Sequence, residues 1–91
     1  MELEYRFAKY VLETYEKQVD KEKVKKYVKA LVDRDVVSIY YTALEIIREL
    51  ADKGAVDFIL TDFIAEFEWK YGYIRKYNPR ELVEAMLGNT E

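Results

Sequence analysis

The chain has 91 residues, which is enough for one small domain. It carries 15 Lys and Arg against 18 Asp and Glu, for a net charge of −3, and it contains neither Cys nor His. These counts exclude disulfide scaffolds, thiolate zinc sites, CxxC redox motifs and catalysis by Cys or His. Because 51% of the residues are hydrophobic, we expect a folded chain rather than a disordered one.

Two apolar stripes in the first third of the chain predict amphipathic helices. The first stripe advances by three or four residues through Leu3, Phe7, Tyr10, Val11, Thr14 and Tyr15. The second stripe lies between Asp20 and Asp33 and comprises Val24, Tyr27, Val28, Leu31 and Val32. Asp20 stands where a helix N-cap accepts hydrogen bonds from the free amides of the first turn.

A third helix is predicted from residue 35 to residue 53. Its apolar face comprises Val36, Tyr40, Ala43, Leu44, Ile47, Leu50 and Ala51. Gly54 follows, at a place where a helix C-terminus favours a residue with positive φ. Pairs of an acid followed by a base at i, i+4 support exposed helices along the whole chain. These pairs are Glu2–Arg6, Glu13–Lys17, Glu22–Lys26, Glu49–Lys53 and Glu66–Lys70.

The fourth segment, residues 56–77, has two interpretations. Its helical register comprises Ile59, Leu60, Phe63, Ile64, Phe67, Tyr71 and Ile74. Alternation of apolar residues around residues 56–60 and 67–73 is also consistent with two short strands. We favour the helix because no two-residue turn signal separates the two runs, and we expect Gly72 to weaken or bend it. Whether residues 55–60 and 66–74 are helical or extended stays open at this point.

The last predicted helix has the clearest boundaries. Asn78 offers an N-cap, Pro79 suits the first helical position and Glu81 places an acid in the first turn. Its apolar stripe comprises Leu82, Val83, Met86 and Leu87, and Gly88 ends it. The sequence therefore predicts an all-α fold, a compact five-helix domain over residues 1–91 with short connections. The core candidates are Leu3, Val11, Val24, Leu31, Leu44, Ile47, Phe63, Ile64, Phe67 and Leu82.

Few residues suit catalysis. With Cys and His absent, a pair of carboxylates is the remaining route to general acid or base chemistry. Asp57, Asp62 and Glu66 are one turn apart and are candidates for a divalent-cation site, or else for the solvated face of an amphipathic helix. The glycines are isolated, so no phosphate-binding loop is present. We expect a protein that is not an enzyme, with no catalytic residue, no cofactor and no metal site.

Basic charge is concentrated between residues 20 and 33, which hold five lysines against three acids. Lys21, Lys25 and Lys29 form a row at i, i+4, i+8, which suits phosphate contacts or an acidic partner, or else is an exposed lysine-rich face. The junction over residues 33–35 resembles a helix-turn-helix connection. The Lys-Gly-apolar step at residues 53–56 resembles the close of the recognition helix in winged-helix DNA-binding domains. That resemblance implies an alternative function, nucleic-acid binding through the lysine row and Arg34.

Aromatic residues give the remaining functional hypothesis. Trp69, Tyr73 and Tyr77 form a second row on the fourth segment, displaced from its main apolar face. Trp and Tyr are favoured anchors of protein interfaces, so this row predicts a contact with a partner or a second copy. The alternative is that the last helix covers the row. The leading hypothesis from the sequence is a small soluble helical module that acts through protein–protein interaction or self-association.

The start of the chain and its apolar runs bear on location. Acids stand near the N-terminus where a secretory signal carries positive charge, and every apolar run is too short to cross a bilayer. We therefore expect a cytoplasmic protein without a membrane partner. Asn and Gln occur three times in total while Lys, Glu and Tyr are frequent, a composition that resembles thermophile proteins.

Overall fold

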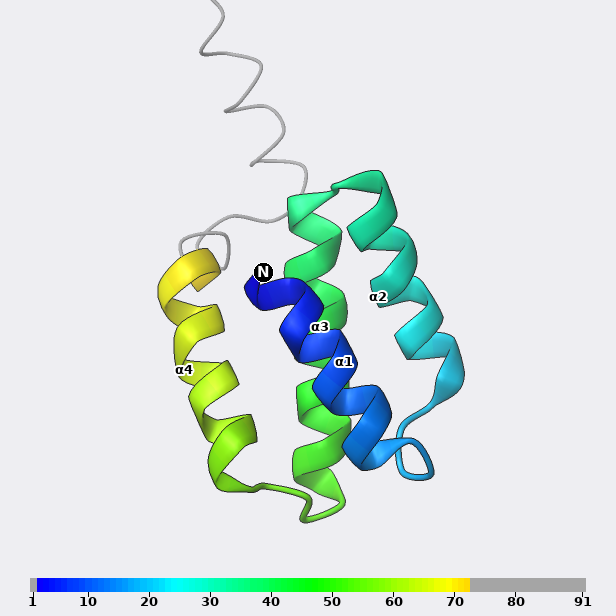
Figure 1. Ribbon diagram of the computed structural model, residues 1–91, viewed down its shortest axis with the longest axis vertical. Helices are drawn as coiled ribbons and strands as arrows, with labels where there is room; N and C mark the ends of the chain where they lie inside the picture. Colours follow the sequence, from blue (N-terminus) through cyan, green and yellow to red (C-terminus); the bar gives the residue numbers. More distant parts are fainter. Residues whose placement is uncertain (1, 73–91) are drawn as a thin grey trace, which may run out of the picture.

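Four helices make up the part of the chain that the structure describes, residues 2–72. In this computed structural model they are α1 (Leu3–Tyr15), α2 (Lys21–Asp33), α3 (Val36–Asp52) and α4 (Phe58–Tyr71). Consecutive helices run in opposite directions, and α3 lies behind α1 with α2 and α4 on either side (Figure 1). Residues 2–72 contain no strand, so the all-α prediction is confirmed for them.

Aspartates begin three of the four helices. Asp20, Asp35 and Asp57 each accept a hydrogen bond from a backbone amide in the first turn of the following helix, at 2.9, 3.2 and 2.7 Å. Such caps satisfy amides that have no partner inside the helix. The cap at Asp20 is the one that the sequence predicts. The predicted start of the fourth helix at residue 56 is wrong by two residues, because the side chain of Asp57 caps a helix that begins at Phe58.

The ends of α2 and α3 have the same backbone geometry with different residues. Gly54 has φ of 74°, as the sequence predicts, and Arg34 has φ of 55°. In each case the amide of the next residue donates to a carbonyl five residues earlier, at 2.9 Å after Gly54 and 3.1 Å after Arg34. These are Schellman turns, which satisfy the last carbonyls of a helix and normally use glycine at the left-handed position.

An aromatic cluster occupies the centre of the core. Phe7 of α1 packs edge-on against Tyr27 of α2 and Phe63 of α4, with ring centroids 5.5 and 5.9 Å apart. Phe67 of α4 lies 6.0 Å from Phe7 and 6.2 Å from Tyr40 of α3. Rings from all four helices therefore meet in one cluster, and such pairs add about 0.5–1.5 kcal/mol each beyond the area that they bury.

The predicted core is largely confirmed. The candidates that are buried are Leu3, Val11, Val24, Leu31, Ile47, Phe63 and Phe67. Leu44 and Ile64 are half-buried and pack against the core, so their prediction as core residues is partly wrong. Both lie at the edge of the buried face of their helix, where periodicity cannot separate the core from its rim. Leu82 lies outside the described residues.

The number and length of the helices differ from the prediction. Residues 2–72 form four helices rather than five, and the fifth, expected near residues 79–88, lies outside the described residues. The fourth helix runs to Tyr71, with Gly72 as its C-cap, and residues 73–77 of the predicted segment lie outside the described residues. Residues 58–60 and 66–71 are helical, which excludes the strand interpretation there.

Several ion pairs join two different helices, whereas the i, i+4 spacing predicts pairs within a single helix. Glu49–Lys53 is the predicted i, i+4 pair that forms among the described residues, at 3.1 Å. Arg6 of α1 instead bonds Glu66 of α4 at 2.9 Å, and Lys70 of α4 bonds Glu4 of α1 at 2.9 Å. These contacts connect the first and last helices of the described chain.

Candidate functional site

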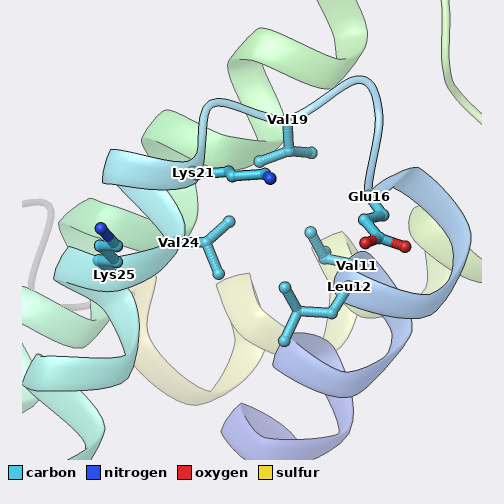
Figure 2. A pocket seen from close by; sticks show the side chains of 7 residues that line it. All are labelled: Val11, Leu12, Glu16, Val19, Lys21, Val24 and Lys25. Atoms are coloured by element: carbon cyan, nitrogen blue, oxygen red, sulfur yellow. The ribbon is translucent and has the colours of Figure 1, made fainter.

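An apolar hollow of about 210 Å³ opens between the C-terminal half of α1 and the N-terminal half of α2. Val11 and Leu12 of α1, Val19 of the connection and Val24 of α2 converge on it (Figure 2). Val11, Val19 and Val24 are buried, whereas 44% of Leu12 is exposed to solvent. The hollow is therefore a gap in the surface that reaches down to the core.

The connection between α1 and α2 shapes this hollow. The amides of Gln18 and Val19 both donate to the carbonyl of Tyr15, at 2.8 and 3.1 Å, and these bonds curl the chain after α1. The curl directs Val19 toward the bundle, where only 8% of it remains exposed. Val19 thus closes one end of the gap that α1 and α2 leave between them.

Three charged side chains stand at the rim of the hollow: Glu16, Lys21 and Lys25. Lys21 extends across the opening, whereas the ammonium of Lys25 is directed away from it (Figure 2). No ion pair or hydrogen bond of the Lys21 side chain forms with other described residues, and Lys25 has an exposed contact of 3.4 Å with Glu22. The rim carries one more positive than negative charge.

Further exposed apolar side chains lie on both helices outside the hollow. Val28 and Val32 follow Lys21 by seven and eleven residues, so they share its face of α2, and they are 40% and 75% exposed. On α1, Tyr5 precedes Leu12 by seven residues and is 47% exposed. We call the hollow together with Tyr5, Leu12, Val28 and Val32 the α1–α2 groove.

Val28 and Val32 belong to the apolar stripe that the sequence assigns to the second helix, but they are exposed. The stripe is wider than the face that α1 and α3 cover, so its outer edge reaches solvent. Leu12 adjoins the stripe of the first helix without belonging to it. This excess apolar width is the one signal in the sequence for the groove, and the predicted functional residues do not include it.

The residues of the nucleic-acid hypothesis do not gather at one place. Lys21 and Lys25 border the hollow between α1 and α2, whereas Lys29 lines a different hollow between α2 and α3. Arg34 lies beyond the end of α2, in a third hollow that it shares with Glu2 and Glu4. The structure therefore unites two of the four predicted contacts.

The aromatic row is described in part. Trp69 is 89% exposed on the outer side of α4. Tyr73 and Tyr77 lie outside the described residues. Phe58, eleven residues before Trp69, is 81% exposed on the same face of the helix. The outer side of α4 therefore carries two large exposed apolar side chains, separated by Asp62 and Ala65.

The carboxylates proposed for a cation site do not form one. Asp57 caps α4, Glu66 bonds Arg6 and Asp62 is exposed. Among residues 2–72, no group of three or more acidic side chains is close enough to hold a metal ion. None of the helices in the same part of the chain combines the length and apolar character needed to cross a membrane.

Asp57 forms a polar cluster with two tyrosines of α1. Its carboxylate accepts hydrogen bonds from the hydroxyls of Tyr10 and Tyr15 and from the amide of Leu60. These bonds, that from Tyr10 foremost, hold the pKa of Asp57 below its ordinary value. Burial and the bond to Asp57 raise the pKa of Tyr15. The cluster links the start of α4 to the C-terminal half of α1 and so helps to hold the two helices together.

Comparison of this chain with protein-family models, with curated proteins and with solved structures gives no match. Function must therefore be argued from the surface itself.

Proposed function

We propose that this chain is a small non-catalytic helical module of the cytoplasm that binds another protein through the α1–α2 groove. The observation that supports the proposal is the apolar hollow of about 210 Å³ with Leu12 exposed at its edge. A cavity of about 150 Å³ holds a benzene molecule, so the hollow has room for one large apolar side chain. Anchors of this kind supply most of the energy of many protein interfaces.

The shape of the groove favours a helical ligand. α1 and α2 run antiparallel to each other (Figure 1). Among their exposed apolar side chains, Tyr5 and Leu12 of α1 are seven residues apart, and Val28 and Val32 of α2 are four residues apart. An amphipathic helix places its apolar residues at the same intervals and lies in such a groove by burying them.

Selection from a random peptide library tests the proposal. Peptides of about 15 residues, long enough for four helical turns, are selected on the immobilised full chain. Each selected peptide is then titrated by fluorescence anisotropy against the parent, Leu12→Gln and the matched control Ile59→Gln. Leu12 and Ile59 are similarly exposed, at 44% and 49%, but Ile59 lies on α4, away from the groove.

We expect Leu12→Gln to weaken the selected peptides about tenfold and Ile59→Gln to leave them unchanged, because truncating an interface anchor typically costs 1 kcal/mol or more. Failure to select any peptide, or peptides that are insensitive to Leu12→Gln, would contradict the proposal. Sedimentation velocity on the same variants separates self-association: if the parent dimerises and Leu12→Gln does not, the occupant is a second copy.

Nucleic-acid binding is the second candidate, and the five lysines of α2 are the observation in its favour. Its test is the affinity for duplex DNA at physiological salt. Non-specific binding has a Kd of about 10⁻⁴–10⁻⁶ M, so saturable binding below about 1 μM that Lys21→Glu, Lys25→Glu and Lys29→Glu together abolish would reverse the order of the two candidates.

A further inference from the structure

We infer that the partner segment that fills the α1–α2 groove is an amphipathic helix with acidic residues on its polar edge. The inference rests on the proposed function and names the chemistry of the ligand. Three features of the groove support it: the charges at the rim, the length of the groove and the position of the hollow within it.

The charges at the rim favour an acidic ligand. The whole chain carries a net charge of −3, yet two lysines, Lys21 and Lys25, line the hollow against one acid, Glu16, and the ammonium of Lys21 lies across the opening (Figure 2). Lys21 forms no ion pair or hydrogen bond with other described residues, and the contact of Lys25 with Glu22 is exposed on both sides, 74% and 75%. Lys21 is therefore available to form an ion pair with a carboxylate of the partner at the opening of the apolar hollow.

The length of the groove sets the length of the ligand. Lys21 and Val32 are eleven residues apart on one face of α2, which corresponds to about 16 Å along the helix axis. Three turns of a partner helix cover this distance. The hollow lies at the Lys21 end, so the partner's largest apolar side chain inserts near one end of the contact rather than at its centre.

The position of the hollow and the length of the groove together define a sequence pattern for the ligand. A Leu or aromatic residue of the ligand enters the hollow beside Val24, and apolar residues three, four and seven positions away meet Leu12 and Val28. Glu or Asp one turn from the anchor lies on the side of Lys21 and Lys25. Backbone groups of the ligand are satisfied within its own helix, so the groove needs to supply only apolar contact and charge.

Three synthetic helical peptides test this inference directly. They share about 18 residues with Leu at the i, i+3, i+4 and i+7 positions and differ only in the residues that flank the apolar stripe, which are Glu, Gln or Lys. The affinity of each peptide for the full chain is measured by fluorescence anisotropy at low and at high salt. The Gln peptide reports apolar contact alone, and the other two add opposite charge to it.

Two charge-reversal variants locate the effect. Lys21→Glu with Lys25→Glu changes the rim, while Lys26→Glu with Lys29→Glu makes the same change in net charge at two lysines that line the separate hollow between α2 and α3. All four side chains are exposed, so both variants should fold. Thermal melts followed by circular dichroism verify this.

We expect the Glu peptide to bind the parent about tenfold more tightly than the Lys peptide, since each exposed ion pair changes affinity a few-fold. High salt should reduce this preference. Lys21→Glu with Lys25→Glu should abolish or invert it, and the control variant should keep it.

Equal affinity of the three peptides, or a preference that survives reversal of Lys21 and Lys25, would overturn the inference. If the Gln peptide binds and is sensitive to Leu12→Gln while the Glu peptide gains nothing, the inference fails and the proposed function stands. If the library yields no ligand for the groove, the proposed function fails as well. Displacement of the Glu peptide by duplex DNA at equal concentration would assign the two lysines to nucleic acid and overturn the inference.

Discussion

The ammonium of Lys70 in α4 lies 2.9 Å from Oε1 of Glu4 in α1, and it holds a carboxylate whose side chain is only 9% exposed. Oε2 of Glu4 is buried and has no hydrogen-bond partner among residues 2–72. The hydrogen bond to Glu4 raises the pKa of Lys70, so the lysine stays charged throughout the range in which the protein is expected to be folded. Because the carboxylate is already under-satisfied, the fold depends on this lysine.

Replacing Lys70 should therefore destabilise the protein. Lys70→Met leaves the Glu4 carboxylate without its cation, and we expect the free energy of unfolding to fall by about 1–3 kcal/mol. Lys9→Met, at an exposed site on α1, should change it by less than about 0.5 kcal/mol. Urea melts measure both. Combining Lys70→Met with Glu4→Gln should recover part of the loss, and strict additivity of the two changes would show that the pair is not coupled.

The Asp57 cluster makes stability depend on acid pH. A carboxyl group whose pKa is lowered in the folded state stabilises that state above its unfolded pKa, near 4, and loses this contribution as the pH falls through the folded pKa. Asp57→Asn keeps an N-cap but removes the charge, so we expect it to cost about 1 kcal/mol at pH 7.

The difference between the parent and Asp57→Asn should shrink as the pH falls below about 4, the unfolded pKa, and continue to shrink as the pH falls through the lowered pKa of the folded state. Thermal melts across this range measure it, at about 4–8 °C per kcal/mol for a chain of this size. Asp62→Asn, an exposed site on the same helix, is the control and should follow the parent at every pH. A gap that persists undiminished at pH 2 would show that charge is not the source of the stabilisation.

Trp69 and Phe67 should respond differently to truncation, although they are two residues apart. Phe67 is 1% exposed in the aromatic core, so Phe67→Ala should cost about 3–5 kcal/mol. Trp69 is 89% exposed, so Trp69→Ala should change the free energy of unfolding by about 0.5 kcal/mol or less. Denaturant melts and sedimentation velocity of both variants measure this.

A loss above about 2 kcal/mol for Trp69→Ala would favour the alternative that residues beyond 72 cover this side chain in the full chain. An unchanged melt with lost self-association would instead assign Trp69 to an interface between copies.

The two Schellman turns predict opposite effects of glycine. Arg34 has φ of 55°, where a residue with a Cβ is strained, so Arg34→Gly should raise the free energy of unfolding by about 1 kcal/mol. Gly54 has φ of 74° and open space around its Cα, so Gly54→Ala should lower it by a similar amount through backbone strain alone. Loss of stability in Arg34→Gly would mean that the contacts of its side chain with the hollow near Glu2 and Glu4 outweigh the strain.

Much of the fold was predictable because burial and periodicity are local properties. The stripes located α2 and α3 to within a residue or two, and Gly54 marked the end of α3 because only a residue without a Cβ adopts its φ without strain. The end of α2 carried no such mark, since Arg34 occupies the equivalent position. The partners of Glu66 and Lys70 were also unpredictable, because they depend on which helices become neighbours.

The candidate site was less accessible from the sequence than the core. Lys21 and Lys25 were singled out by their spacing, but their relation to an apolar hollow depends on the curl that buries Val19. Leu12 gives no signal of a binding site in the sequence, because a single exposed leucine is common on protein surfaces. Only the packing of α1 against α2 brings these side chains together, and no pattern within one helix encodes that packing.

The cap at Asp57 also determines where the chain tolerates insertion. Val56 is 57% exposed, and the turn after α3 is complete once the amide of Ala55 has bonded to Leu50. Extra residues placed between Ala55 and Val56 therefore lengthen a free stretch of chain and leave both flanking helices closed. The same residues placed after Asp57 would separate α4 from its cap and from both tyrosines of α1. A reporter or affinity tag inside this protein should therefore be inserted between Ala55 and Val56, two residues before the boundary of α4.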